Sequence, residues 1–184
     1  VGTIANDQIG SGGVTPLSNG SVVVRSPLAN NGAIVDAGLV HVVVPPGGGG
    51  FTNPLGFADN AAGTTTITPA QITAITNTGT AVTLQANTDV TLAAASPITT
   101  VAGGAGGAIT MQAGRSVLLN SNITTDNGNL TITANDPGAV SNRDAGSAVI
   151  AMASGASINA GSGAINMTLS SAGVGPTGDI TLGG

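Results

Sequence analysis

The sequence predicts an all-β protein built as a β-solenoid, in which short parallel strands stack in successive coils. Three observations lead to this prediction. Apolar and polar residues alternate along short runs, similar runs recur from residue 64 onward, and turns containing glycine or asparagine separate them. Alternation with a period of two gives a strand one buried and one exposed face, and recurrence at a roughly constant interval is typical of stacked repeats.

The clearest repeat unit spans residues 108–136. Its first run, residues 109–113, matches residues 82–86 and 130–134, and a related run begins at Ile165. These runs start at residues 82, 109, 130 and 165, so their spacings are 27, 21 and 35 residues. Uneven spacing is expected when strands stay in register and insertions bulge from the corners. We expect the largest insertion, residues 136–147, to protrude from the wall of the solenoid.

The composition favours a narrow, stacked interior. Hydrophobic residues make up 41% of the chain but aromatic residues only 1%, with two Phe and no Trp or Tyr. The core must therefore be built from Val, Ile, Leu, Ala and Met, and β-branched side chains pack well on their equivalents in neighbouring strands. Gly and Pro are spread between the apolar runs, which argues against one long disordered tail.

Charged residues are scarce, at 6% of the chain, and the formal net charge is −5. The three basic residues are all Arg and form no cluster, so the sequence indicates neither a nucleic-acid partner nor binding to an anionic membrane surface. No apolar run reaches the roughly 18 residues of a membrane span, so no membrane insertion is expected. Cysteine is absent, which excludes disulfides and thiolate metal sites.

Residues 1–63 form a less regular, β-rich N-terminal segment, which we expect to act as a cap or to supply assembly strands. Strands are expected at residues 21–26, 33–35 and 39–44, with a turn at 30–32 and a glycine-rich linker at 47–50. The two aromatic residues, Phe51 and Phe57, are expected to plug an end of the core.

Residues 64–184 form the β-helix repeat region. A strand is expected at 64–68, and residues 69–75 form either a helical turn, with Pro69 at its first position, or a bent strand. In the last coil, residues 180–182 take the place of residues 90–92. With strands stacked roughly 4.8 Å apart, about six coils would build the core.

The two ends of the sequence predict a fragment or an assembling subunit. The first residues include no Met and no charged leader, so they are not an intact signal peptide. Residues 179–184 are strand-like without a polar cap, and solenoids usually need capping. We therefore expect the chain to continue in a longer polypeptide, or to self-associate into rods or fibres, end to end or by strand addition.

Four stretches of the repeat region carry a resemblance to a known family. They are ITPAQITAITNTGTAVTLQANTDVTLAAASPITT at residues 67–100, AITMQAGRSVLLNSNITTDNGNLTITAND at 108–136, RDAGSAVIAMASGASINAGSGAINMTLSS at 143–171 and GDITL at 178–182. In this order they resemble the repeats of filamentous-haemagglutinin-type exoproteins, which are large bacterial two-partner-secretion adhesins. The resemblance covers residues 64–184.

The resemblance implies a right-handed parallel β-helix that is exported through a dedicated outer-membrane pore and acts in adhesion or aggregation. It implies a secreted protein at the bacterial cell surface but supplies no receptor. A glycan or protein on the surface of a host or neighbouring cell is our expectation for a partner. The residues themselves also favour a structural or adhesive role over an enzyme, because Glu and Lys are missing and the eight Asp are scattered. Arg143 and Asp144 are expected to be a solvated surface pair in a loop.

Two alternative functions stay open. A β-helix can bind or cleave carbohydrates, and cleavage requires clustered carboxylates. A β-helix with a continuous outer ladder of Thr is the other alternative, as an ice-binding protein. That ladder is broken here, because Gln85, Gln112 and Thr133 occupy the equivalent outer position. We expect any contact surface in the loops at 102–107 and 136–147 or in the first 63 residues.

No metal or cofactor site is predicted, although one weak set of calcium candidates exists. Asp126, Asn127 and Asp136 carry the oxygen ligands that calcium favours. The same residues are strong turn formers, and we expect that role because the Gly-Gly-x-Gly-x-Asp calcium repeat is absent. His41, the single histidine, is expected to be an ordinary strand residue, since one His without Cys or Glu builds no familiar zinc site.

Four asparagines lie in N-x-Ser/Thr sequences, which are acceptors for N-linked glycans. They are Asn19, Asn122, Asn129 and Asn166. Such matches arise easily by chance in a chain rich in Asn and Thr, so the sequence identifies these positions only as candidate glycosylation sites.

Overall fold

The computed structural model of the chain describes residues 14–16, 22–26, 39–43, 51–139 and 142–183. The chain divides into two compact units, Val1–Phe51 and Thr52–Gly184. This boundary lies earlier than the one predicted at residue 63. The physical reason is that Asn53 and Leu55 already bond to the first strand of the second unit.

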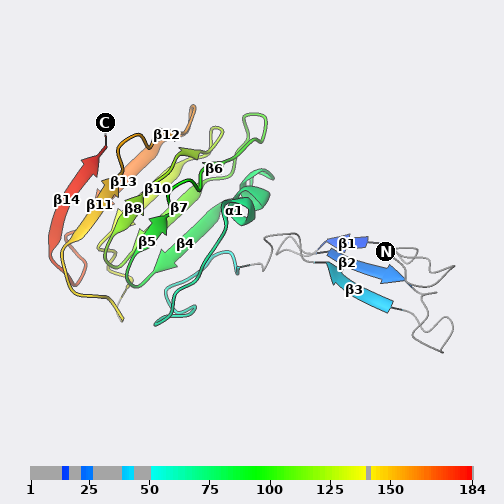
Figure 1. Cartoon of the computed structure of the whole chain (residues 1–184), viewed down its shortest axis with the longest axis horizontal. Coiled ribbons are helices and arrows are strands. Elements are labelled where there is room, and N and C mark those ends of the chain that lie inside the picture. Colours follow the sequence, from blue (N-terminus) through cyan, green and yellow to red (C-terminus); the bar gives the residue numbers. More distant parts are fainter. Residues whose placement is uncertain (1–13, 17–21, 27–38, 44–50, 140–141, 184) are drawn as a thin grey trace. The chain divides into compact units, whose positions relative to one another are not determined.

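In the first unit, three described strands form an antiparallel sheet. They are β1 (Val14–Pro16), β2 (Val22–Ser26) and β3 (Leu39–Val43), in the order β1-β2-β3 (Figure 1). The strands predicted at 21–26 and 39–44 are thereby confirmed. The turn, strand and linker predicted at 30–32, 33–35 and 47–50 lie outside the described residues.

The second unit consists of three parallel sheets that the chain visits in rotation (Figure 1). Sheet 1 contains β4 (Val82–Ala86), β7 (Ile109–Ala113), β10 (Leu130–Ala134) and β13 (Ile165–Leu169). Sheet 2 contains β5 (Val90–Leu92), β8 (Val117–Leu119), β11 (Ala148–Met152) and β14 (Thr177–Leu182). Sheet 3 contains β6 (Ile98–Thr99), β9 (Ile123–Thr124) and β12 (Ile158–Asn159). Parallel strands in stacked sheets make this unit nearly all-β and compatible with the predicted β-solenoid.

The register of sheet 1 confirms the predicted repeat residue by residue. One row across the four strands contains Val82, Ile109, Leu130 and Ile165. In sheet 2, Ile180 lies in the row of Val90, as predicted. Sheet 1 has four strands, fewer than the about six coils expected. The difference arises because residues 52–81 form a cap on the first coil and not a coil of their own.

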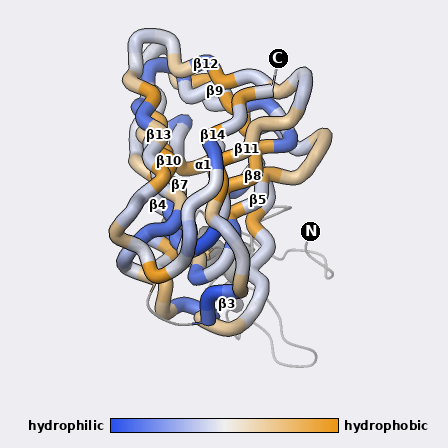
Figure 2. The backbone as a smooth tube through the Cα atoms, turned by 90° about the vertical axis from the view of Figure 1, so that its left-hand side faces the viewer, coloured by the Kyte–Doolittle hydropathy of each residue, from blue (hydrophilic) through white to orange (hydrophobic). Residues whose placement is uncertain are grey.

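Every second residue of the central strands points into the core. The burial alternates strictly along β7 and β10, and the central residues Met111 and Ile132 are 2% and 0% exposed. Figure 2 shows the apolar segments of successive coils lying over one another. Among the described residues, the buried hydrophobic side chains are all Ile, Leu, Val, Ala and Met, as the composition predicts.

One short helix, α1 (Pro69–Thr76), precedes the first coil. Thr68 is its N-cap: the Gln71 N–H donates to Thr68 Oγ1 at 3.3 Å, and the Thr68 N–H donates to Gln71 Oε1 at 2.7 Å. Of the two alternatives for residues 69–75, the helix is therefore the one observed. The strand predicted at 64–68 is wrong, because Leu55 already occupies the edge of β4 that such a strand would join.

The first coil is capped over two of its three sheets. On β4, the Leu55 N–H donates to Thr83 O at 3.0 Å and the Gln85 N–H donates to Leu55 O at 2.9 Å. The Asn53 side chain donates to Ala81 O at 2.8 Å and accepts from the Thr83 N–H at 3.1 Å. All these strand groups would otherwise face outward unpaired, so residues 53–55 replace a neighbouring strand.

Helix α1 covers the corresponding edge of sheet 3. Thr76 Oγ1, at the end of the helix, lies 2.7 Å from Thr100 Oγ1, and both residues are buried. The Val101 N–H donates to Asn77 Oδ1 at 2.7 Å. The helix thus provides the polar partners that a preceding coil would provide at this corner.

The last coil is different, because its apolar residues face solvent. Ile165, Ile180 and Leu182 are 45%, 43% and 58% exposed. Leu130 and Ile150, the row partners of Ile165 and Ile180 one coil earlier, are both 0% exposed. The described chain therefore has one capped end and one end where apolar rows of the core stay open.

In the described part of the chain, no helix has the length and apolar character needed to cross a membrane.

Candidate functional site

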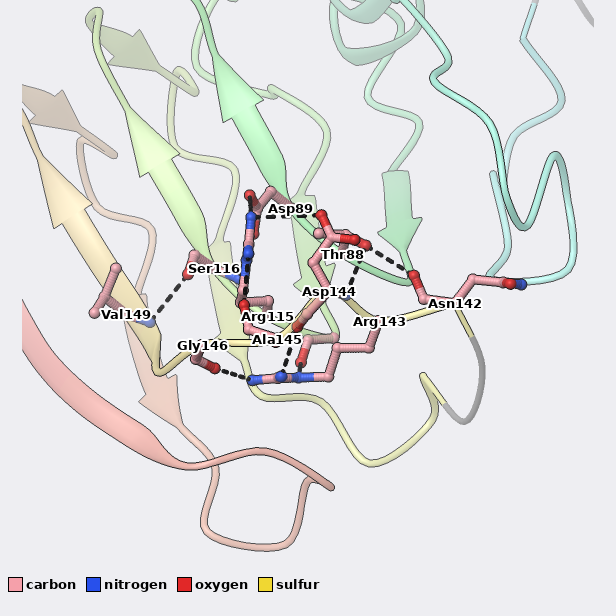
Figure 3. Close-up of polar contacts among 11 residues, drawn as sticks. Thr88, Asp89, Arg115, Ser116, Asn142, Arg143, Asp144, Ala145, Gly146 and Val149 are labelled. Carbon is pink, nitrogen blue, oxygen red and sulfur yellow. Dashed lines mark hydrogen bonds and ion pairs between the residues drawn. The ribbon is translucent and has the colours of Figure 1, made fainter.

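Half of the charged side chains of the second unit, four of eight, lie at one corner between sheets 1 and 2. Asp89 and Arg115 precede β5 and β8, and Arg143 and Asp144 belong to the insertion before β11 (Figure 3). Two of the three Arg of the chain therefore lie together with two of its eight Asp. We refer to these four residues as the Arg–Asp corner.

Asp89 and Arg115 form a two-point ion pair between neighbouring coils. Arg115 Nη2 donates to Asp89 Oδ2 at 2.6 Å, and Arg115 Nε donates to Asp89 Oδ1 at 2.9 Å. The Ser116 N–H also donates to Asp89 Oδ1, at 3.0 Å. A planar guanidinium matches a carboxylate in this geometry, which makes such pairs stronger than single contacts. The two side chains are only 26% and 23% exposed, so water screens them incompletely.

The contacts of this pair shift the pKa of both side chains. Burial raises the pKa of Asp89, but the hydrogen bonds from Arg115 and Ser116 and the nearby positive charges outweigh burial, so the pKa lies below its ordinary value. The hydrogen bond to Asp89 raises the pKa of Arg115. Both groups are therefore held in their charged forms, which is the state that the ion pair needs.

Arg143 fastens the insertion through backbone carbonyls. Its Nε donates to Gly114 O at 2.6 Å, and its two other nitrogens donate to Asp144 O and Gly146 O at 2.8 and 3.0 Å (Figure 3). Arg115 adds a bond to Ala145 O at 2.9 Å. The described residues of the insertion are therefore bonded to the neighbouring coils, although most of them are exposed, so our expectation that it protrudes is only partly right.

The expectation of a solvated Arg143–Asp144 pair is also only partly right. The Asp144 side chain is 68% exposed, but its carboxylate lies 3.7 Å from Arg115 and no ion pair joins it to Arg143 among the described contacts. The guanidinium of Arg143 is directed at main-chain oxygens instead. The two cations of the corner are thus occupied in holding coils together.

A cleft of about 780 Å³ lies beside this corner, between the cap and the first coil. Its floor includes Leu92 and Ile98, and its rim includes the carboxylates Asp59, Asp89 and Asp144. Among the described residues that line it, none is Arg, Lys or His. Phe57 is half-buried and lines the cleft, so it covers part of the core end, as predicted; Phe51 is half-buried at the end of the first unit.

Two buried asparagines hold the loops at either end of the coils. Asn87, 6% exposed, donates through Nδ2 to Phe57 O at 2.8 Å and Ala61 O at 2.9 Å. Asn135, 0% exposed, donates to Ser170 O at 2.8 Å and Gly175 O at 2.9 Å. Each follows the last residue of a sheet 1 strand, β4 or β10. The two asparagines therefore have equivalent roles: Asn87 holds the cap and Asn135 holds a loop of the last coil.

The three calcium candidates are not brought together. Asp126 and Asn127 precede β10, whereas Asp136 follows it. Asp126 Oδ2 accepts the N–H groups of Ala102 and Gly104 at 2.5 and 3.0 Å, and these bonds lower the pKa of Asp126. Across the described part of the chain, no cluster of three or more His, Cys, Asp or Glu is placed to hold a metal ion.

Asn127 and Asp136 also serve the fold. Asn127 bridges two coils, donating to Gly104 O at 3.0 Å and accepting from the Ser162 N–H at 2.8 Å. Asp136 accepts from Gln112 Nε2 and from the Gly138 N–H, both at 2.8 Å. With φ of 52° and 72°, Asp126 and Asn127 adopt the left-handed backbone of a tight turn. This is the turn chemistry that we predicted for the group.

The candidate glycosylation sites in the second unit are exposed. Asn122 and Asn129 lie at the sheet 3 corners, where their Oδ1 atoms accept from the N–H groups of Ser157 and Ala164, both at 2.9 Å. Asn166 is exposed on β13. Asn19 lies outside the described residues. His41 is paired with Val24 within the sheet of the first unit.

Sequence reasoning missed the Asp89–Arg115 pair, the buried asparagines and the role of Asn53. A signal for the ion pair was present. The spacing of 27 residues that aligns Val90 with Val117 also places Arg115 opposite Thr88, next to Asp89. No such signal exists for Asn53, because its partner strand is identified only by the folded path of the chain.

Comparison with known proteins yields no similarity that identifies the chain: no family model, no curated protein and no solved structure matches it.

Proposed function

We propose that the chain is a structural and adhesive segment or subunit of a secreted bacterial surface adhesin or filament. In this proposal it belongs to the filamentous-haemagglutinin type, its coils form a right-handed parallel β-helix, and two-partner secretion exports it. The observation that carries the proposal is the continuous register of sheet 1 across four strands. Such a ladder makes a stiff rod, because each inner strand is paired on both sides.

The side-chain contacts between coils support a structural role. The Arg–Asp corner, Asn135 and Asn127 connect neighbouring coils, and Asn87 connects the first coil to the cap. The carboxylate of Asp89 and the guanidinium groups of Arg115 and Arg143 are used in these connections. A scarcity of charge and the absence of Cys also fit a chain that crosses an envelope unfolded.

Self-association is part of this proposal. The exposed apolar rows of the last coil supply a surface for contact between copies, or for a continuing coil. Head-to-tail stacking on the first coil is obstructed over β4 and β6, where residues 53–55 and α1 already cover the edges. We therefore expect copies to meet through their last coils, with surface glycans or proteins of other cells as additional partners.

Electron microscopy and small-angle scattering of the purified chain test the rod. We expect elongated particles whose association grows with concentration, and retention of coated beads on cells that present the receptor. An unfolded variant, Ile132→Asp, is the matched control for bead retention. A compact, strictly monomeric scattering profile at every concentration would count against the self-association.

The second candidate function, carbohydrate binding or cleavage, is favoured by the cleft next to the cap. Binding on a glycan array, or release of reducing ends from a polysaccharide, would favour this alternative. We expect neither to depend on Asp89, because that carboxylate is engaged by Arg115 and Ser116. The ice-binding alternative is weakened by the observed register, which places Gln85, Gln112 and Thr133 in one row.

A further inference from the structure

The three sheet edges of the first coil differ in how they are covered. The edge of β4 is paired by Asn53 and Leu55, and the edge of β6 is covered by α1. The edge of β5 is paired with no other strand in the described part of the chain, and β5 lines the cleft of about 780 Å³. Among the described residues, sheet 2 is thus the sheet whose first strand has neither a paired segment nor a helix on its outer edge.

The direction of the β5 backbone groups follows from two hydrogen bonds. The Val90 N–H donates to Ser116 O at 3.0 Å, and Leu92 O accepts from the Asn120 N–H at 3.0 Å. Both residues are therefore directed at β8. Since backbone groups alternate along a strand, the N–H and C=O of Thr91 point the other way, toward the cleft. Beyond the β5–β8 ladder, no hydrogen bond joins Thr91 to another described residue.

Leu55 shows how an extended residue satisfies such an edge. It bonds to Thr83 O through its N–H and to the Gln85 N–H through its C=O. A residue opposite Leu92 would make the same two bonds, to Thr91 O and the Ala93 N–H, and a residue opposite Val90 would accept the Thr91 N–H through its C=O. On β4 a single extended residue pairs with the outer backbone groups of the strand. A short strand segment would therefore be enough to pair with those of β5.

The walls of the cleft indicate the chemistry of the occupant. Leu84, Leu92 and Ile98 form an apolar floor, and they are 7%, 8% and 1% exposed. Thr64 and Thr66 also line the cleft. The rim carries carboxylates and no basic residue among those described, which disfavours an anionic occupant. A floor of this kind suits apolar side chains at every second position.

We propose that this cleft binds an extended, neutral or basic polypeptide segment, which adds to sheet 2 as a strand beside β5. The occupant places alternate apolar side chains on the floor and pairs its backbone with Thr91. This inference goes beyond the proposed function, because a rod built from the coils does not require it. It assigns a peptide-binding site at the capped end, whereas self-association uses the last coil.

Titration of the full chain with a labelled peptide tests the proposal. The probe is an acetylated, amidated peptide with the sequence of residues 21–26, Ser-Val-Val-Val-Arg-Ser, which combines three β-branched residues with one Arg. Fluorescence polarisation is expected to show saturable binding. A probe with its central Val replaced by Pro, and a probe with its Arg replaced by Asp, are expected to bind at least about tenfold more weakly.

The matched protein variant is Thr91→Pro, which removes the N–H directed at the cleft and is expected to abolish binding without unfolding the chain. Hydrogen exchange of the Thr91 amide in the unaltered chain gives a second readout, with fast exchange that the peptide slows. A Thr91 amide protected without peptide would overturn the proposal, since residues 64–68 would then close the edge. Binding of neutral oligosaccharides in place of the peptide, unaffected by Thr91→Pro, would also overturn it.

Discussion

Arg115 and Asp89 meet across neighbouring coils, with Nη2 2.6 Å from Oδ2 and Nε 2.9 Å from Oδ1. The pair joins the strands β8 and β5 at the point where each begins. It also positions Arg115 to bond to the insertion at Ala145. One ion pair therefore connects three segments of chain that are distant in sequence.

Replacing this carboxylate is expected to weaken the fold in a pH-dependent way. Because the pKa of Asp89 is lower in the folded chain than the ordinary 3.8, its stabilising contribution is present above about pH 4 and is lost as pH falls through the folded value. Asp89→Asn should cost about 1–2 kcal/mol near pH 7, given partial exposure. Urea unfolding of both proteins should converge once pH falls below the lowered folded pKa of Asp89.

Asp179→Asn is the control for loss of a negative charge, since Asp179 lies exposed on β14. This control should unfold like the unaltered chain at every pH. A constant difference between Asp89→Asn and the unaltered chain down to the lowest pH would contradict the assignment of the linkage to this ion pair.

Removing the buried side chain of Asn135 should release the loop that it holds. Asn135 has φ of 54°, so Asn135→Gly removes the amide without backbone strain. The loss leaves Ser170 O and Gly175 O without their bonds, and should cost about 2–3 kcal/mol by chemical denaturation. Hydrogen exchange should rise in residues 170–175, whereas the exposed Asn120→Ala should change neither quantity.

Calcium should leave the thermal stability of the chain unchanged. Asp126 Oδ2 is engaged by two N–H groups and Asp136 by Gln112 and Gly138, at opposite ends of β10. Scanning calorimetry with millimolar calcium and with a chelator should give one melting temperature. Asp126→Asn should melt earlier to the same degree in both conditions; a rise with calcium that this substitution removes would show a site.

The repeat itself could be predicted from the sequence because its strands carry the same alternation in the same order. Residues 82–86, 109–113 and 130–134 share apolar first and third positions, and the observed register pairs them as the sequence aligns them. Buried rows of similar side chains fix the register, since a slip of one residue would turn every apolar side chain outward.

The caps and fastenings could not be predicted in the same way. Asn53 satisfies β4 through a side chain, so it has no strand periodicity that a sequence pattern would reveal. Residues 64–68 have the composition of a strand, yet the edge they would join is already taken by Leu55. These outcomes depend on which segment the tertiary structure brings to each strand edge, and a local sequence pattern does not contain that information.

Truncating two side chains of the same core row should change the free energy of unfolding by very different amounts. Leu130 and Ile165 are paired in register, but Leu130 is 0% exposed and Ile165 is 45% exposed. Leu130→Ala should cost about 3–5 kcal/mol and Ile165→Ala about 1 kcal/mol or less. Denaturant titrations measure the loss in free energy of unfolding for both variants. If the two losses are equal at high protein concentration but unequal at low concentration, copies of the chain cover the last coil.

Proline substitutions on neighbouring strands test the open edge of β5 without any ligand. Thr91 and Leu118 are paired in register, but the N–H of Thr91 faces the cleft. Leu118 lies between Ser116 and Asn120, which bond to β5, so its N–H is directed into the ladder. Thr91→Pro should cost about 1 kcal/mol or less, whereas Leu118→Pro should cost about 3 kcal/mol or more.

Circular dichroism during urea unfolding measures both costs, and Thr91→Ala and Leu118→Ala separate the effect of the ring from loss of the side chain. The comparison is informative because both side chains lie on the outer face, with Thr91 exposed and Leu118 half-buried. If Thr91→Pro proves as damaging as Leu118→Pro, the edge of β5 must be paired in solution. A segment of the chain itself, residues 64–68 above all, would then complete sheet 2.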